Sequence, residues 1–185
     1  MNTAFDLLSI PEASLSNQME KEIISLQYIA FPYVEVFRNQ RWGDSQPTGA
    51  DMWFLAKSSQ GLVASVWLHR RTISAVTNGF SIGGIANVCS RPDFRGKGAA
   101  KACMLEAQNY IVNCAAIDCG LLFVGPKVAS FYDKLGWHRV ENRFWFTNGK
   151  GERNHDDYCI KMVFPAHFGQ KPWPKGDIDL NGPEW

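Results

Sequence analysis

The stretch from Phe80 to Val124 constrains the fold more than any other part of the sequence. It begins with a strand predicted over residues 80–89, passes through a loop that contains Gly96 and Gly98, and continues with apolar residues at helical spacing. It ends in Gly120–Val124, a short and wholly apolar run that is typical of a parallel strand buried on both faces. A strand, a helix and a second strand in this order predict one parallel crossover within a sheet.

The flanking segments add helices and antiparallel strands. Apolar residues recur at helical spacing from Leu15 to Ala30, so we expect a helix there, capped by Ser14 and ended by Pro32. Strand patterns bounded by turn residues follow at 52–57, 62–71, 139–146 and 158–164. The predicted fold class is therefore α/β: a mixed, mostly antiparallel central sheet with one parallel crossover and flanking helices.

Length and composition favour one domain over residues 1–185, with a core of about 52–164 and a Pro/Gly-rich tail at 165–185. The formal net charge of +1 predicts no nucleic-acid partner, and no apolar run reaches the roughly 18 residues of a membrane span. The five cysteines form no CxxC pair, which argues against a disulfide framework and against a metal site. We expect a cytoplasmic protein that binds no metal, nucleic acid or membrane.

The loop before the predicted helix has the composition of an anion site. Gly96 and Gly98 let the backbone turn tightly and expose successive N–H groups, and the N-terminus of the following helix points at the same place. Arg95 and Lys97 add positive charge, so a pyrophosphate is the expected guest. The alternative is an ordinary strand-to-helix turn with a basic surface. The loop matches neither a Walker sequence nor a dinucleotide-binding GxGxxG.

Two strings resemble the signatures of the GNAT superfamily of N-acetyltransferases. The string Val88–Ala100 is similar to its acetyl-CoA signature, with Arg95, Gly98 and Ala100 at the three defining positions. Downstream, Ala129–Trp137 resembles the second signature, and the two are separated by a helix and a buried strand, as in that family. The resemblance spans roughly residues 52–164.

The resemblance implies acetyl-CoA as co-substrate and assigns residues to it. The strands at 80–89 and 120–124 would splay apart, and the pantetheine arm would pair with the backbone of the first strand at Val88, Cys89 and Ser90. The pyrophosphate would bind the loop beside Arg95 through the N–H groups of Gly96, Lys97, Gly98, Ala99, Ala100 and Lys101. Gly125–Lys127 departs from the family, because many relatives have an asparagine there.

The same resemblance assigns catalytic roles. Tyr132 matches the usual general acid, and a phenol with a pKa near 10 can protonate a departing thiolate. The alternative is a tyrosine that only packs. The oxyanion would rest on a backbone N–H around Val88. Many relatives have a glutamate base where this chain has Ala86, and the neighbouring Asn87 cannot act as a base.

The base and the acceptor contacts must therefore come from elsewhere. Glu35, Asp44 and Asp51 belong to the irregular segment that lines the acceptor site in the family, and each is either a surface acid or a substrate contact. Cys89 lies near the expected thioester path, but nothing in the sequence activates it as a nucleophile. The His69–Arg71 string is expected to be structural.

The tail ends in Trp173-Pro-Lys-Gly176 and, further on, Asn181-Gly-Pro-Glu184-Trp185. This string resembles the ending of the nodulation N-acyltransferase NodA, and it is also similar to the shorter acidic, Trp-terminated tail of the aminoglycoside 2′-N-acetyltransferases; both act on amino sugars. By that resemblance Asp179, Glu184 and the carboxylate of Trp185 would bind a cationic amino sugar. Alternatively, the tail covers a sheet edge or mediates a homodimer.

The sequence thus predicts an acetyl-CoA-dependent N-acetyltransferase that acts on the primary amine of a small, aminoglycoside-like amino sugar. Three alternatives stay open: a peptide or protein N-acetyltransferase, an acyltransferase that takes longer acyl donors from a carrier protein, and a non-catalytic acyl-CoA sensor.

Overall fold

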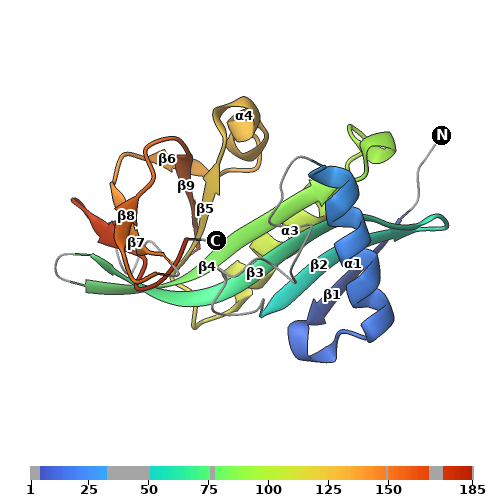
Figure 1. Ribbon diagram of the computed structural model, residues 1–185, viewed down its shortest axis with the longest axis horizontal. Coiled ribbons are helices and arrows are strands. Elements are labelled where there is room, and N and C mark those ends of the chain that lie inside the picture. The colour runs from blue at the N-terminus through green and yellow to red at the C-terminus, as the bar shows by residue number, and fades with distance from the viewer. Residues whose placement is uncertain (1–4, 33–50, 76–77, 149, 167–172, 185) are drawn as a thin grey trace. The chain divides into compact units, whose positions relative to one another are not determined.

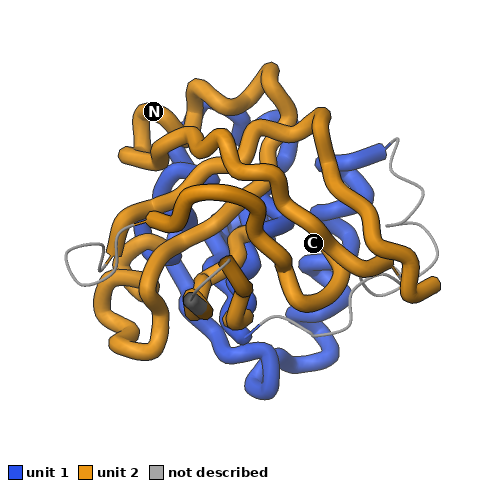
Figure 2. Tube along the Cα trace, turned by 90° about the vertical axis from the view of Figure 1, so that its left-hand side faces the viewer, with its two compact units in different colours: residues 1–44, 48–69, 86–107 blue, residues 45–47, 70–85, 108–185 orange. Residues whose placement is uncertain are grey.

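The structure is a computed structural model that describes residues 5–32, 51–75, 78–148, 150–166 and 173–184. These residues fall into two units, drawn in blue and orange in Figure 2. Unit 1 draws its residues from Met1–Asp44, Thr48–His69 and Ala86–Ala107, and unit 2 from Ser45–Pro47, Arg70–Ile85 and Gln108–Trp185. The expectation of a single domain over residues 1–185 stays a prediction.

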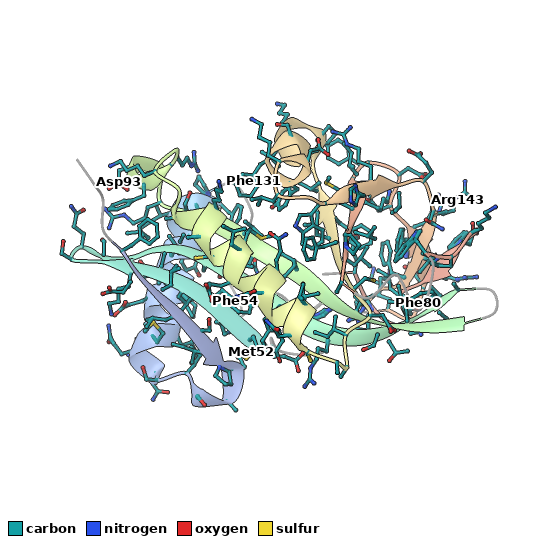
Figure 3. All side chains as sticks on the ribbon, turned by 180° about the vertical axis from the view of Figure 1, so that it is seen from behind. Met52, Phe54, Phe80, Asp93, Phe131 and Arg143 are labelled. Atoms are coloured by element: carbon teal, nitrogen blue, oxygen red, sulfur yellow. The ribbon has the colours of Figure 1, made fainter. Side chains whose placement is uncertain are left out.

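Unit 1 contains three antiparallel-paired strands and the helices that cover them. Its elements are β1 (Asp6–Pro11), η1 (Glu12–Ser14), α1 (Asn17–Ala30), β2 (Met52–Ser58), the first part of β3 (Gly61–Ala75), the last part of β4 (Asn78–Ser90), η2 (Pro92–Phe94) and the first part of α3 (Ala99–Asn113). β1 pairs with β2 and β2 pairs with β3, both antiparallel. In Figures 1 and 3, α1 and α3 lie on opposite faces of these strands.

The core of unit 1 forms where the apolar face of α1 meets β2 and β3. Ile23 and Leu26 of α1 are buried against Trp53 and Trp67, whose ring centroids are 6.0 Å apart. The helix begins two residues later than predicted, because Ser16 is its N-cap: the Ser16 hydroxyl accepts a hydrogen bond from the N–H of Met19. Ser14, the predicted cap, lies in the 3-10 turn η1 instead.

Unit 2 holds the parallel crossover and most of the remaining strands. Its further elements are β5 (Cys119–Val124), η3 (Pro126–Val128), α4 (Ala129–Asp133), β6 (His138–Val140), β7 (Phe144–Thr147), β8 (Arg153–His155), β9 (Ile160–Pro165) and β10 (Ile178–Asp179). The strand order is β6-β9-β5-β4-β3-β10-β7-β8. β4 and β5 are parallel over three residue pairs, Ile82–Gly84 with Cys119–Leu121, although β5 continues to Val124. The predicted mixed sheet is confirmed.

A glycine in β5 shows how tightly the helix-covered face of this sheet is packed. A Cβ on Gly120 would lie 2.8 Å from the ring of Trp137 and 3.1 Å from both Ile111 and Phe164. Any side chain at position 120 would therefore displace Trp137, which is fully buried. The contact between Gly120 and Trp137 thus holds the segment that follows α4 against β5.

Two predictions about the strands of unit 2 are wrong in detail. The strand predicted over 139–146 is two strands: β6 pairs with β9, whereas β7 pairs with β8 and β10. The tail, predicted without a strand, contributes β10, which lies between β3 (antiparallel) and β7 (parallel). The sheet therefore has a second parallel pair, which the sequence pattern did not indicate.

Candidate cofactor and catalytic site

The loop that carries the predicted acetyl-CoA signature runs from Arg91 to the start of α3 in unit 1. Gly96 and Gly98 have φ angles of +75° and +88°, a conformation that favours glycine. A Cβ built on either residue would meet no atom within 4 Å, so the loop backbone borders open space. This is the arrangement expected of a loop whose backbone approaches a ligand closely.

The first turn of α3 adds hydrogen-bond donors at the same place. The N–H of Ala102 donates to the carbonyl of Gly98 at 2.9 Å, which is the first helical hydrogen bond. The N–H groups of Ala99, Ala100 and Lys101 precede it, and such groups at a helix start have no acceptor within the helix. Together with the partial positive charge of the helix N-terminus they suit a phosphate group.

The loop is held by Arg91, a residue that sequence reasoning missed. Its guanidinium donates to the carboxylate of Asp93 at 2.6 and 3.0 Å and to the backbone carbonyl of Gln60 at 3.1 Å. The hydrogen bond from Arg91 lowers the pKa of the Asp93 carboxyl. Arg91 and Lys97 lie over the ring of Phe94, at 5.1 and 4.9 Å from its centroid. In the sequence, only the Arg91-Pro-Asp-Phe94 string could have indicated these contacts.

The end of β4 carries the predicted pantetheine contacts. Asn87 has a φ of +51° inside the strand, so the regular extended backbone is interrupted immediately before Val88. Asparagine tolerates this conformation better than most residues. Where a strand is interrupted, its backbone N–H and C=O groups no longer point along the regular hydrogen-bonding pattern of the sheet. The interruption at Asn87 therefore bears on Val88, the residue whose backbone was predicted to hold the oxyanion. In the sequence, Asn87 was noted only as the neighbour of Ala86, which stands where many relatives have a glutamate base.

Cys89 follows Val88 and faces the core. Its Sγ lies 3.2 Å from the hydroxyl of Ser65, and burial raises the pKa of the thiol to about 11. A thiol with that pKa is almost entirely protonated near neutral pH. This agrees with the expectation that Cys89 contributes its backbone and not a nucleophilic sulfur.

Tyr132, the predicted general acid, lies on α4 in unit 2. Its side chain is 7% exposed, and its ring makes edge-on contacts with Phe131 and Trp137, with centroids 4.9 and 6.5 Å away. The backbone carbonyl of Tyr132 accepts from the N–H groups of Leu135 and Trp137. Gly136, at φ +83°, completes this turn. The loop and Tyr132 belong to different units, so their action on one thioester stays a prediction.

The predicted acceptor contacts have different outcomes. Asp51 is tied by its backbone, since its N–H donates to the carbonyl of Leu68 and its carbonyl accepts from the N–H of Glu12. Glu35, Asp44 and Trp185 lie outside the described residues. A substrate contact by Asp51 stays a prediction.

In the tail, Asp179 is paired, because the guanidinium of Arg153 lies 3.1 Å from its carboxylate and the N–H of Asn181 donates to it at 2.8 Å. Glu184 is half-buried, and desolvation together with the charge of Asp156 raises the pKa of its carboxyl, although the charge of Lys161 opposes that shift. A carboxyl with a raised pKa has the property expected of a base for an amine.

Arg71, the last residue of the His69–Arg71 string, contacts the tail in unit 2. The guanidinium of Arg71 donates to the backbone carbonyl of Pro183. The side-chain amide of Asn181 donates to the carbonyl of Thr72 at 3.0 Å and to the hydroxyl of Ser74 at 2.8 Å. Arg71 therefore has the structural role that was predicted for it.

Within the described ranges, no three His, Cys, Asp or Glu side chains lie close enough together to hold a metal ion. Among the same residues, no helix combines the length and the apolar character of a membrane-spanning segment.

Comparison with known proteins relates this chain to acyltransferases by fold. No protein-family model matches the sequence, and no curated protein sequence matches it. Among solved structures, the GNAT family N-acetyltransferase YhbS from Escherichia coli, in complex with CoA, is similar with a TM-score of 0.67 and 12% identity, over 98% of this chain and 93% of that chain. An acyl-CoA N-acyltransferase from Pseudomonas aeruginosa (TM-score 0.62, 17% identity) and Escherichia coli ElaA (0.61, 16%) each match over 87% of this chain and 99% of theirs.

These similarities define the fold of this chain as that of the GNAT N-acetyltransferases. The predicted fold class is thereby confirmed. None of these structures supports the narrower resemblance of the tail to NodA or to aminoglycoside acetyltransferases.

Proposed function

We propose that this chain is an acetyl-CoA-dependent N-acetyltransferase that acetylates the primary amine of a small molecule. The observation that carries the proposal is the loop of Gly96 and Gly98, in left-handed conformation directly before the first turn of α3, within a GNAT fold. Such a loop suits the pyrophosphate of CoA. The binding of CoA by YhbS, which shares this fold, supports the same cofactor.

The proposed reaction is direct transfer. The neutral amine attacks the carbonyl carbon of the thioester, a C–N bond forms, and the negative charge on oxygen is stabilised by a backbone N–H next to Val88. The C–S bond then breaks, and the phenol of Tyr132 gives its proton to the departing CoA thiolate. The amine loses one proton to a carboxylate, directly or through water, and that proton finally restores Tyr132. Covalent transfer through Cys89 is disfavoured by the raised pKa of its thiol.

Glu184 is our candidate for that carboxylate. The position of the usual glutamate base is occupied by Ala86. Glu184 belongs to unit 2, as does Tyr132, and the pKa of its carboxyl is raised. A base whose pKa lies closer to neutral accepts a proton from an ammonium group more readily than an ordinary carboxylate does.

An amino sugar is our candidate acceptor, as the tail suggested. The observed contacts of the tail change which of its carboxylates is expected to bind the amine of the acceptor. Asp179 is already paired with Arg153, so Glu184 is the better candidate for meeting the amine.

The proposal is tested by mixing the purified chain with acetyl-CoA and a panel of small primary amines that includes neutral, anionic and polycationic amino sugars. We expect equal amounts of free CoA thiol and N-acetylated amine, measured by a thiol reagent and by mass spectrometry. Tight CoA binding without any acetylated amine would instead identify an acyl-CoA sensor. Thiol release without an acetylated product would identify a hydrolase.

A further inference from the structure

Unit 2 contains an open cavity of about 850 Å³ that none of the predicted site residues lines. Three segments form its walls: the connection from β6 to β7, the stretch between β8 and β9 with the start of β9, and the tail at 174–177. Its volume is within the range of small-molecule sites. The walls are polar and carry charges of both signs, which suits a charged ligand better than an acyl chain.

The cavity lies at the end of unit 2 where the catalytic tyrosine is proposed. Ile160 lines the cavity and pairs with Val124, the last residue of β5. Arg139 also lines it, and its guanidinium lies 2.7 Å from the carboxylate of Asp133, the last residue of α4 and the neighbour of Tyr132. In α/β sheets, ligands bind beyond the carboxyl ends of parallel strands, and β5 ends here.

Most acids around the cavity already have partners. The ammonium of Lys161, a residue only 9% exposed, donates to the backbone carbonyl of Asp156 and lies 3.6 Å from its carboxylate. Asp157 lies 2.9 Å from the imidazole of His155, and Asp177 accepts from the indole of Trp145 at 2.8 Å. Each of these three carboxylates therefore already has an ion-pair or hydrogen-bond partner within unit 2.

Two cations of the cavity are unpaired. In the part of the chain that the structure describes, the side chains of Arg143 and Lys175 make neither an ion pair nor a hydrogen bond, and Glu141 is the one acid of the lining in the same condition. The side-chain amide of Asn142 donates to the carbonyls of Pro174 and Gly176, the two neighbours of Lys175. Arg143, which is labelled in Figure 3, follows Asn142 in the chain, so these hydrogen bonds join the two cavity-lining segments that carry Arg143 and Lys175.

We propose that this cavity binds the acceptor, and that the acceptor is a primary amine that also carries an anionic group, a carboxylate or a phosphate. Arg143 and Lys175 bind the anionic group, because a guanidinium and an ammonium that line the cavity and have no ion-pair partner among the described residues match its charge. The amine then lies toward Asp156, Lys161 and the carboxyl end of β5. This inference rests on the proposed transferase function for the meaning of "acceptor", but the binding itself does not depend on it.

The first experiment measures binding in the absence of acetyl-CoA, by calorimetry. The probes are two matched pairs that differ only in the anionic group: glucosamine 6-phosphate against glucosamine, and 4-aminobutyrate against butylamine. We expect the anionic member of each pair to bind at least tenfold more tightly (about 1.4 kcal/mol). Equal affinities within both pairs, or tighter binding of a polycationic aminoglycoside than of either anionic amine, would overturn the proposal.

The second experiment assigns the binding to these side chains. The double variant Arg143→Ala with Lys175→Ala changes two exposed residues, so the fold is expected to persist. It should lose the preference for the anionic member and keep its affinity for CoA. Lys150→Ala, an exposed cation of unit 2 outside the cavity, is the matched control and should keep the preference. Retention of the preference for the anionic member in the double variant would contradict the proposal. If the parent protein did not bind CoA at all, only the proposed transferase function would be contradicted.

Discussion

The indole nitrogen of Trp173 donates a hydrogen bond to the side-chain oxygen of Asn142, with the two atoms 2.7 Å apart. The amide nitrogen of the same Asn142 donates to the carbonyls of Pro174 and Gly176 at 3.0 and 2.6 Å. One side chain thus fixes the start of the tail, whose Ile178 and Leu180 are fully buried in the core of unit 2. The tail is part of the sheet.

Replacing Asn142 with alanine should therefore destabilise the protein. The change leaves the indole of Trp173 and two backbone carbonyls without their partner, at an expected cost of about 1–3 kcal/mol in the free energy of unfolding. Asn154→Ala is the control, because Asn154 makes a single, longer bond to the carbonyl of Glu152. Thermal unfolding should show a larger fall in melting temperature for Asn142→Ala than for Asn154→Ala. Equal falls would mean that the hydrogen bonds of Asn142 to the tail add no specific stability.

Glu184 should make stability depend on pH. Because the pKa of its carboxyl is raised in the folded state, the native protein binds this proton more tightly than the unfolded chain does. The free energy of unfolding then decreases as the pH rises from the ordinary glutamate value, 4.5, through the raised folded value. Glu184→Gln removes that loss, so the variant should gain stability over the parent as the pH increases, measured by melting temperature from pH 4 to pH 8.

The control for Glu184→Gln is Glu141→Gln, which removes a carboxylate at an exposed position of the same unit. A stability difference between Glu184→Gln and the parent that stays constant over this pH range would refute the role of burial at Glu184.

Cys89 should be unreactive in the native protein. With a thiol pKa of about 11, roughly one molecule in a thousand carries the thiolate at pH 8. Iodoacetamide labelling followed by peptide mass spectrometry should modify the more exposed Cys114 well before Cys89. An acetyl adduct on Cys89 after incubation with acetyl-CoA would show covalent catalysis and exclude the direct mechanism.

Tyr132→Phe should remove proton transfer and little else. The substituted ring keeps its contacts with Phe131 and Trp137, so the fold and the affinity for CoA should persist. Turnover should fall by roughly 10²–10⁴-fold, measured in single-turnover experiments. Tyr158→Phe, at a side chain that is 73% exposed, is the matched control and should retain full activity. An undiminished rate in Tyr132→Phe would exclude Tyr132 from the chemistry.

The parts of the structure that depend on local sequence were predicted well. Periodicity alone placed α1 and α3 to within a few residues, and glycine spacing placed the turn at Gly96 and Gly98. The buried run at 120–124 predicted β5 because a strand covered on both faces has no polar alternation.

The tail could not be predicted in this way, because its order depends on residues distant in the sequence. β10 is two residues long and follows Gly176 and Asp177, so it shows no strand pattern. It is held by Asn142 and by Arg71, which lie 31 or more residues away in the sequence. The same cause explains the break between β6 and β7, since Asn142 lies at that break and bonds to the tail.

The predicted cofactor residues follow one another from the end of β4 through the loop to the first turn of α3, but the support of that loop was missed. Arg91 bonds to Gln60, a residue of the turn between β2 and β3, and no sequence motif connects the two. The acceptor site was even more difficult to predict from the sequence. Its prediction rested on carboxylates, whereas the structure shows Asp179 paired with Arg153, and among the described residues Arg143 and Lys175 have no ion-pair partner.

The central claim, that the loop of Gly96 and Gly98 binds acetyl-CoA, is tested most directly by calorimetry on two glycine variants. Gly98 (φ +88°) and Gly151 (φ +80°) both have left-handed backbones, and a Cβ on either would meet nothing within 4 Å, so alanine costs each position a similar backbone strain. We expect the parent and Gly151→Ala to bind acetyl-CoA with a Kd on the order of micromolar and Gly98→Ala to bind at least tenfold more weakly. Equal binding by the two variants, or no binding by the parent, would contradict the account.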